Sequence, residues 1–217
     1  MDVVIYPLAD CLYINLTNRC TCRCQFCPLA LKEPLTVQGF DLKLSEEPTT
    51  EAILKEIANY EQKFSRPKEI VFCGYGEPTL RLKELKEIAR ALKKKNYFIR
   101  LNTNGHANWI HKRNVAPELN GLIDEVRVSL NACDATEYRE LNQPLSPKNL
   151  YPCVKEFIVA CKNQIPKVIV SAVALSTLNQ TRFQKIAHKE LEVSVLFRDL
   201  DQQGVPQRVL PISSSVK

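Results

Sequence analysis

Short apolar runs alternate along this chain with longer stretches in which apolar residues recur every three or four positions. The short runs are rich in Val, Ile, Leu and Phe and predict strands at 12–16, 69–72, 98–103, 125–130, 167–174 and 193–197. The longer stretches predict helices at 50–63, 82–94, 117–122, 149–163 and 181–190. Strands and helices that alternate in this way are typical of a parallel α/β fold.

The order of these elements also predicts a shape. Right-handed crossovers between six parallel strands curl the sheet into an open, partial (β/α)6 barrel, whose ligands bind at the carboxyl ends of the strands. We expect residues 1–200 to form a single domain. Residues 201–217 lack periodicity and contain two prolines and three consecutive serines, so we expect a flexible C-terminal tail.

Composition indicates the class of protein and its cellular location. Of 217 residues, 45% are hydrophobic and 25% charged, which is ordinary for a globular chain that buries a core. Asp2 and Asp10 bracket a start that lacks the basic and long apolar regions of a signal peptide, and the apolar run 168–178 is too short to cross a bilayer. We therefore expect a cytoplasmic protein without a membrane partner.

The net charge of +6 points only weakly to a partner. Basic residues concentrate at 90–95, at the end of a predicted helix, where cations complement the negative helix terminus. Few aromatic residues lie among them, so nucleic-acid binding is not indicated. An anionic substrate remains open.

Four of the nine cysteines lie in the segment Cys20-Thr21-Cys22-Arg23-Cys24-Gln25-Phe26-Cys27, directly after the first predicted strand. The Cys-x3-Cys-x2-Cys spacing has one register, Cys20, Cys24 and Cys27, because Phe26 occupies the position that a shifted register needs. Three thiolates can hold three irons of a [4Fe-4S] cubane and leave the fourth iron open to a small molecule.

Other uses of these cysteines are less favoured. A structural zinc site closes a tetrahedron with a second ligand pair, and the chain has no second Cys-x2-Cys and no His-x3-5-His. An odd number of cysteines at this density does not suit a disulfide framework. We expect Cys22 to face away from the cluster, with a redox-sensitive or reserve role as the alternative.

Three further polar or glycine-rich segments lie at the carboxyl ends of predicted strands, and therefore fall on the same rim as the cysteines. They are Gly74-Tyr75-Gly76-Glu77-Pro78, Asn102-Thr103-Asn104-Gly105 and Ser129-Leu130-Asn131. Each segment by itself is equally a plausible turn. Their common position after a cysteine loop makes a binding role the stronger interpretation.

Together these motifs resemble the radical S-adenosylmethionine (SAM) superfamily, including the aromatic Phe26 before the last cysteine. The resemblance implies a partial-barrel enzyme whose [4Fe-4S] cluster, on Cys20, Cys24 and Cys27, reductively cleaves SAM. The product is a 5′-deoxyadenosyl radical that abstracts hydrogen from the substrate. An external electron donor of the flavodoxin or ferredoxin type is implied as a partner.

The resemblance also implies SAM-binding residues. Gly74, Gly76 and Glu77 resemble a Gly-Gly-Glu-Pro segment that receives the methionine ammonium, with Tyr75 departing from the pattern. Asn102 and Asn104 resemble a segment that lines the SAM or substrate pocket. Ser129 and Asn131 resemble an element that reaches the ribose hydroxyls.

The substrate stays open, either a small molecule or another protein. The segments 13–20, 71–82 and 100–105 look most like the TatD-associated radical SAM proteins. As a compact barrel of this length, the chain also resembles 7-carboxy-7-deazaguanine synthase and the glycyl-radical-enzyme activases. A different class, a non-catalytic iron–sulfur redox sensor, would explain the cysteines without the other rim segments.

Some residues near the predicted rim have less defined roles. His106 is a candidate proton shuttle, whereas His111 and His188 are expected at the solvated surface. Cys73 and Cys133 are expected mostly as small apolar fillers, with a catalytic thiol as the alternative. Residues 28–48 form the least readable segment and are a candidate substrate-recognition loop.

Overall fold

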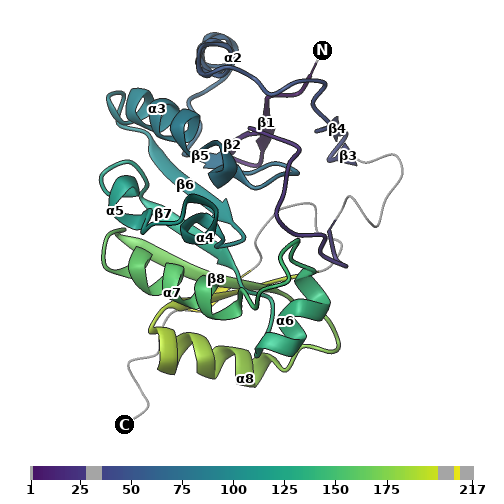
Figure 1. Ribbon diagram of the computed structural model, residues 1–217. Helices are drawn as coiled ribbons and strands as arrows, with labels where there is room; N and C mark the ends of the chain where they lie inside the picture. Colours follow the sequence, from purple (N-terminus) through teal and green to yellow (C-terminus); the bar gives the residue numbers. More distant parts are fainter. Residues whose placement is uncertain (1, 28–35, 200–207, 211–217) are drawn as a thin grey trace.

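The computed structural model describes residues 2–27, 36–199 and 208–210 (Figure 1). Its main feature is a curved sheet of eight strands in the order β1-β2-β5-β6-β7-β8-β9-β10. The six strands from β2 to β9 are parallel, and a strand at each edge pairs antiparallel. The fold is therefore the α/β partial barrel that the alternation of elements predicts.

The six parallel strands lie close to their predicted positions. They are β2 (Cys11–Ile14), β5 (Glu69–Phe72), β6 (Phe98–Thr103), β7 (Glu125–Ser129), β8 (Lys167–Val173) and β9 (Ser194–Arg198). The sequence pattern missed β1 (Ile5–Leu8), which pairs with β2 in antiparallel register. Pro7 interrupts that run, and proline is tolerated in a strand at the edge of a sheet.

The helices cover one side of the sheet, as Figure 1 shows for α3, α5 and α7. Their bounds are α2 (Thr50–Lys63), α3 (Leu82–Lys93), α4 (Ala107–His111), α5 (Ala116–Leu119), α6 (Ala135–Asn142), α7 (Tyr151–Lys162) and α8 (Gln180–Lys185), with a 3-10 turn η1 (Pro78–Arg81) and a π-helical turn η2 (Ile186–Leu191). In α3, the fully buried Leu85, Ile88 and Leu92 recur at three- and four-residue spacing and pack on the strands. This stripe explains why α3 was predictable.

The two faces of the parallel strands differ in chemistry. On β6, Ile99 and Leu101 join the core beneath the helices, so the intervening Arg100 and Asn102 point to the opposite, concave face. A second, smaller apolar cluster lies on the concave face near β1 and β2. It contains Tyr6, Leu8, Tyr13, Leu42, Val71 and Tyr75. The concave face is thus part apolar core and part polar cavity.

Two segments with open predictions fall partly outside the described residues. Of the candidate recognition loop at 28–48, residues 28–35 lie outside, and the rest includes a hairpin of β3 (Thr36–Val37) and β4 (Phe40–Asp41). Of the expected flexible tail at 201–217, the structure describes β10 (Arg208–Leu210), which pairs antiparallel with β9. Among the described residues, no helix is long and apolar enough to cross a membrane.

Candidate radical SAM site

The cysteine loop opens into a cavity of about 280 Å³ on the concave face of the sheet. The predicted ligands Cys20, Cys24 and Cys27 all line this cavity, and so does Phe26. The other predicted site residues line the same cavity: Gly74, Gly76, Glu77, Asn102, Asn104, Ser129 and Asn131. Segments separated by up to about a hundred residues therefore meet at one place, as the rule of the carboxyl ends predicts.

The cysteine loop is held by the last residues of α6 and the chain that follows it. The backbone N–H groups of Arg23 and Gln25 donate to the carbonyl oxygens of Gln143 and Leu141, at 3.1 and 3.0 Å. In return, the N–H of Leu145 donates to Thr21, at 2.9 Å. Because these bonds replace regular secondary structure, the loop has a defined shape without belonging to the sheet.

The glycine segment lies directly against the approach to the cysteine loop. The N–H groups of Gly76 and Glu77 donate to the carbonyl oxygens of Thr17 and Arg19, at 3.0 and 2.8 Å. A Cβ atom on Gly76 would lie 2.3 Å from the Thr17 oxygen, and one on Gly74 would lie 2.1 Å from the Asn15 Oδ1 atom. Gly76 is thus required for the close packing of two backbones, whereas Gly74 leaves room for the Asn15 side chain.

Glu77 is the central acid of the site and is 2% exposed. Its Oε1 atom accepts hydrogen bonds from the N–H and hydroxyl of Thr79 and from the Thr103 hydroxyl, at 3.0, 2.6 and 2.7 Å. Its Oε2 atom accepts from the N–H of Asn104, at 2.7 Å. Burial raises the pKa of Glu77, and these hydrogen bonds offset part of that rise. No ion pair within the described residues involves this carboxylate.

Asn104 and His106 brace the cysteine loop from the end of β6. The amide of Asn104 donates to the Thr21 hydroxyl at 2.8 Å and lies 3.8 Å from the Cys20 sulfur. His106 is fully buried, with Nδ1 2.8 Å from the same hydroxyl and Nε2 2.7 Å from the hydroxyl of Tyr138. Burial lowers the pKa of His106 to about 4, so the imidazole is neutral near pH 7. A brace for Thr21 explains this histidine better than a proton shuttle.

From the sequence we expected Cys22 to face away from the cluster. In the structure it lies on the same side as the other cysteines of the loop. It is 8% exposed, lines the cavity and lies 3.7 Å from the amide nitrogen of Asn104. A hydrogen bond between the two thiols lowers the pKa of Cys20 and raises that of Cys22. Of this pair, Cys20 is therefore the readier thiolate.

The two residues predicted to bind the ribose, Ser129 and Asn131, differ in the hydrogen bonds that they already make within the protein. Asn131 has a left-handed backbone, with φ of 57°, and its amide is occupied at both ends. It donates to Asn142 Oδ1 at 2.9 Å and accepts from the N–H of Val173 at 3.1 Å. The Ser129 hydroxyl makes only a long contact of 3.5 Å with Ser171 and one of 3.5 Å with Arg198.

Sequence reasoning missed several residues of the cavity. Asn142 lies 3.5 Å from the Cys24 sulfur through its carbonyl oxygen, and nothing in its local sequence marks it. Arg100, Arg127 and Arg198 also line the cavity. The signal for the first two was visible, because charged residues alternate with buried Ile, Leu and Val along β6 and β7.

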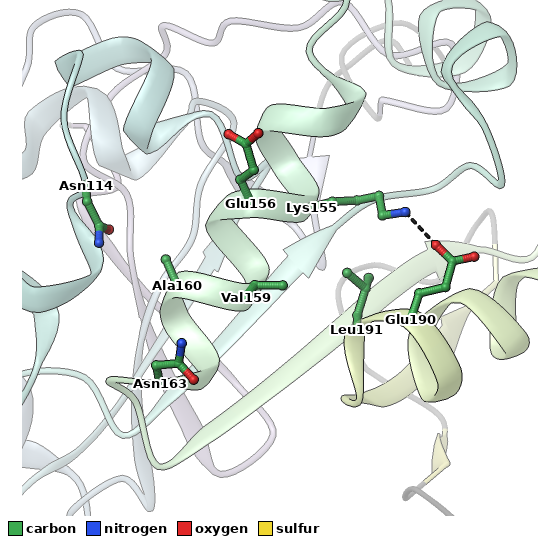
Figure 2. Close-up of a pocket in the computed structure, with 8 residues that line it drawn as sticks. All are labelled: Asn114, Lys155, Glu156, Val159, Ala160, Asn163, Glu190 and Leu191. Carbon is green, nitrogen blue, oxygen red and sulfur yellow. Dashed lines mark hydrogen bonds and ion pairs between the residues drawn. The ribbon is translucent and has the colours of Figure 1, made fainter.

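Of the remaining predicted residues, Cys73 lines the cavity, and His111, His188 and Cys133 do not. His111 is partly buried and bonds the Thr79 carbonyl at 2.7 Å, and the Nε2 atom of His188 is buried, so neither is fully solvated. Cys73 lines the cavity, whereas burial raises the pKa of Cys133 to about 11. Figure 2 shows a second hollow, between α7 and η2, where Lys155 and Glu190 pair at 2.6 Å.

The donor set fits an iron–sulfur cluster and SAM. Within the described residues, no three Cys, His, Asp or Glu side chains converge on a single metal ion. A cubane instead takes each thiolate on a different iron, which suits three sulfurs spread around one cavity. The buried Glu77 carboxylate, without a described cation, suits an incoming ammonium group.

Comparisons with known proteins identify the class of this chain. Residues 14–189 match the model of the Radical SAM superfamily, and the chain belongs to that family. The chain spans only part of the length of the solved structures that share its fold, 41–66% of the three compared below. A search of curated protein sequences gives no significant match.

Solved structures of radical SAM proteins share the fold at low sequence identity. TYW1 with a bound lysine–pyruvate adduct is 15% identical, with a TM-score of 0.60 over 89% of this chain and 66% of TYW1. SuiB of Streptococcus suis, bound to its precursor peptide SuiA, is 16% identical, with a TM-score of 0.63 over 91% of this chain and 41% of SuiB. A radical SAM methyltransferase from Sphaerobacter thermophilus is 15% identical, with a TM-score of 0.61 over 97% of this chain and 62% of its own.

Proposed function

We propose that this chain is a radical SAM enzyme in which Cys20, Cys24 and Cys27 hold the [4Fe-4S] cluster. When bound, the cluster and SAM supply a 5′-deoxyadenosyl radical, which abstracts hydrogen from the substrate. The observation that carries the proposal is the convergence of the cysteine loop, Glu77 and Asn104 on one cavity.

The chain's own residues would divide the work of binding SAM. Glu77 would receive the methionine ammonium, beside backbone that Gly74 and Gly76 keep open. Asn104 orients the cysteine loop, and Asn102, which lines the same cavity, would contribute to the SAM or substrate pocket. Ser129 would reach the ribose, whereas Asn131, whose amide is already bonded, would shape the wall around it.

We further propose the TatD-associated proteins as the subgroup, supported by the motif strings around Cys20, Glu77 and Asn104. A 7-carboxy-7-deazaguanine synthase-like or glycyl-radical-activase-like reaction is the alternative. Radical SAM enzymes need a reductant, and we propose a flavodoxin or ferredoxin as the donor. The structure shows no disulfide among the described cysteines, which supports the reducing, cytoplasmic setting that we propose.

Anaerobic reconstitution tests the proposal. With dithionite and SAM, the wild-type protein should form 5′-deoxyadenosine, and reduced samples should give the EPR signal of one [4Fe-4S] cluster. A redox-sensing module would bind iron without forming this product.

The cysteines provide matched variants for the ligand assignment. Cys24→Ala should lose most of its iron and sulfide, because a cubane with a missing thiolate is under-coordinated. Cys22→Ala, from the same loop, should keep the full cluster. A full cluster in Cys24→Ala, or its loss in Cys22→Ala, would move the ligand set to other cysteines.

A further inference from the structure

Cationic side chains on the parallel strands outnumber the carboxylates of the same strands on the concave face, although Glu77 and Asp199 also line the cavity. Four cationic strand residues, Arg100, Arg127, Lys167 and Arg198, accompany two strand carboxylates, Glu69 and Glu125. Glu69 pairs with Arg100 at 2.9 Å. Glu125 is shared, since it pairs with Arg127, with Lys167 at 2.8 Å and, more distantly, with Arg100 at 3.9 Å.

Arg198 is the one of these four cations that has no carboxylate partner among the described residues. No ion pair within the described residues involves it, and its recorded hydrogen bond is a long one of 3.5 Å from Nη2 to the Ser129 hydroxyl. Its Nε atom is buried without a hydrogen-bond partner. Burial lowers the pKa of Arg198, which is the direction expected of a guanidinium without a carboxylate.

Arg127, on β7, lines the same cavity as Arg198. It lies two residues before Ser129 on β7, and its side chain is 11% exposed. Its Nη1 atom is also buried without a partner, and its charge acts on that of Arg198. Two guanidinium groups that repel each other and have unused donors in one cavity form an incomplete arrangement.

The strand register places hydroxyl groups between the two arginines. Ser129 on β7 pairs with Ser171 on β8, and Val173 on β8 pairs with Arg198 on β9. Arg198 therefore reaches back across β8 to Ser129. A group bound there would meet two guanidinium forks and a serine hydroxyl, which together are a donor set for a carboxylate or phosphate.

We propose that Arg127, Arg198 and Ser171 form the seat for an anionic group, a carboxylate or phosphate, of the substrate of this enzyme. The inference rests on the proposed function, because the seat and the cysteine loop line one cavity. Cys24 and Arg198 line the same cavity, so a substrate anchored at the seat would share that cavity with the cysteine loop. The substrate class is thus a small organic anion.

The test uses the reconstituted holoprotein, with inorganic phosphate and succinate as probes at constant ionic strength. Both anions should bind saturably in calorimetric titrations and raise the melting temperature above that in matched chloride. Arg127→Gln and Arg198→Gln should each weaken the tighter-binding probe about tenfold, the loss expected of one charge-assisted bond. Arg198→Lys, which keeps the charge but not the fork, should fall between.

A second readout does not depend on ligand. Because Arg198 has no described carboxylate partner, Arg198→Gln should leave the melting temperature without probe unchanged or higher. Arg113→Gln is the control, since Arg113 is exposed and pairs with Glu118 at 2.8 Å, outside the cavity. Its affinity for both probes should match that of the wild type.

Several outcomes would overturn the assignment. These are no saturable binding of either probe, equal loss in Arg113→Gln, or a clear drop in the melting temperature of Arg198→Gln. Loss of iron in Arg198→Gln would mean that Arg198 supports the cluster. Loss of SAM affinity would mean that Arg198 binds the carboxylate of SAM. Formation of 5′-deoxyadenosine by the same wild-type preparation reports separately on the proposed function.

Discussion

At the scale of single residues, the site depends on buried polar groups that serve two purposes. Glu77 accepts four hydrogen bonds and thereby joins the glycine segment to the end of β6. His106 similarly joins Thr21 of the cysteine loop to Tyr138 of α6. Each residue is therefore structural in the free protein, and the proposed ligand contacts are additional to that role.

The variant Glu77→Gln separates the structural role of Glu77 from its proposed role in binding SAM. The amide cannot accept from the N–H of Asn104 while its oxygen serves Thr79 and Thr103, so we expect a loss of about 1–3 kcal/mol in the free energy of unfolding. SAM affinity should fall about tenfold, because a charge-assisted bond to the ammonium is lost. Urea unfolding and calorimetric titration of reconstituted protein measure the two effects.

Glu56→Gln is the control for Glu77→Gln, because Glu56 is an exposed acid on α2 far from the cavity. It should change neither quantity. SAM affinity that is unchanged in Glu77→Gln would leave Glu77 with its structural role alone.

His106 predicts a dependence of stability on pH. Its folded pKa of about 4 lies below the ordinary value of 6.5, so the unfolded chain takes up the proton first as pH falls. The free energy of unfolding of the cluster-free chain should therefore decrease from pH 6.5 to pH 4, by about 3 kcal/mol from this residue.

His106→Gln should lack this contribution, while losses from other groups remain. Urea unfolding of both proteins at intervals from pH 4 to pH 7.5 measures the difference. Parallel curves for the two proteins would mean that His106 does not titrate in this range.

At the scale of elements, the cysteine loop depends on close backbone contacts more than on its own sequence. Residues 141–145 hold it from one side. The glycine segment holds its approach, with Gly76 at the closest point. The loop should therefore fail to bind a cluster when this contact is opened, even with all cysteines present.

Gly76→Ala tests this dependence. The added Cβ would lie 2.3 and 2.4 Å from the Thr17 and Arg19 oxygens, so the segments must separate, at about 1–3 kcal/mol. We expect a lower melting temperature and reduced iron content after reconstitution.

Gly121→Ala is the matched control. Its Cβ would meet no atom within 4 Å, although its φ of 73° costs a side chain about 1 kcal/mol. It should keep its full iron content. Equal iron loss in both variants would show that general destabilisation, and not the loop contact, is responsible.

At the scale of the whole molecule, the curved sheet is the rigid part on which the site is built. Strands β6 and β7 lie in the middle of the order, are paired on both sides and face the main core. Strand β1 lies at an edge and pairs only with β2. The cavity residues Asn102 and Thr103 of β6 and Arg127 and Ser129 of β7 are thus attached to the best-supported strands.

Hydrogen exchange should follow this order. Amides in β6 and β7 should exchange at least about a hundredfold more slowly than those in β1, because they open only with the sheet. Mass spectrometry of labelled peptides measures the rates in cluster-free and reconstituted protein. Equal protection of β1 and β6 would mean that the sheet opens as a single unit.

The sequence alone determined the order of the six parallel strands and the identity of the cysteine loop, but it missed the helices α4 and α6. Hydrophobic periodicity and ligand spacing are local properties, which is why the six parallel strands and the segments around Cys20, Glu77 and Asn104 could be predicted. The edge strand β1 escaped because Pro7 interrupts a short run.

Only the tertiary structure decided what each polar residue contacts. Asn104 reaches Thr21 across 83 positions, and Cys24 meets Asn142 across 118. The inward position of Cys22, the bracing role of His106 and the unpaired charge of Arg198 likewise depend on neighbours brought by other strands. Such contacts follow from the curvature and register of the sheet, and no local pattern of residues specifies these.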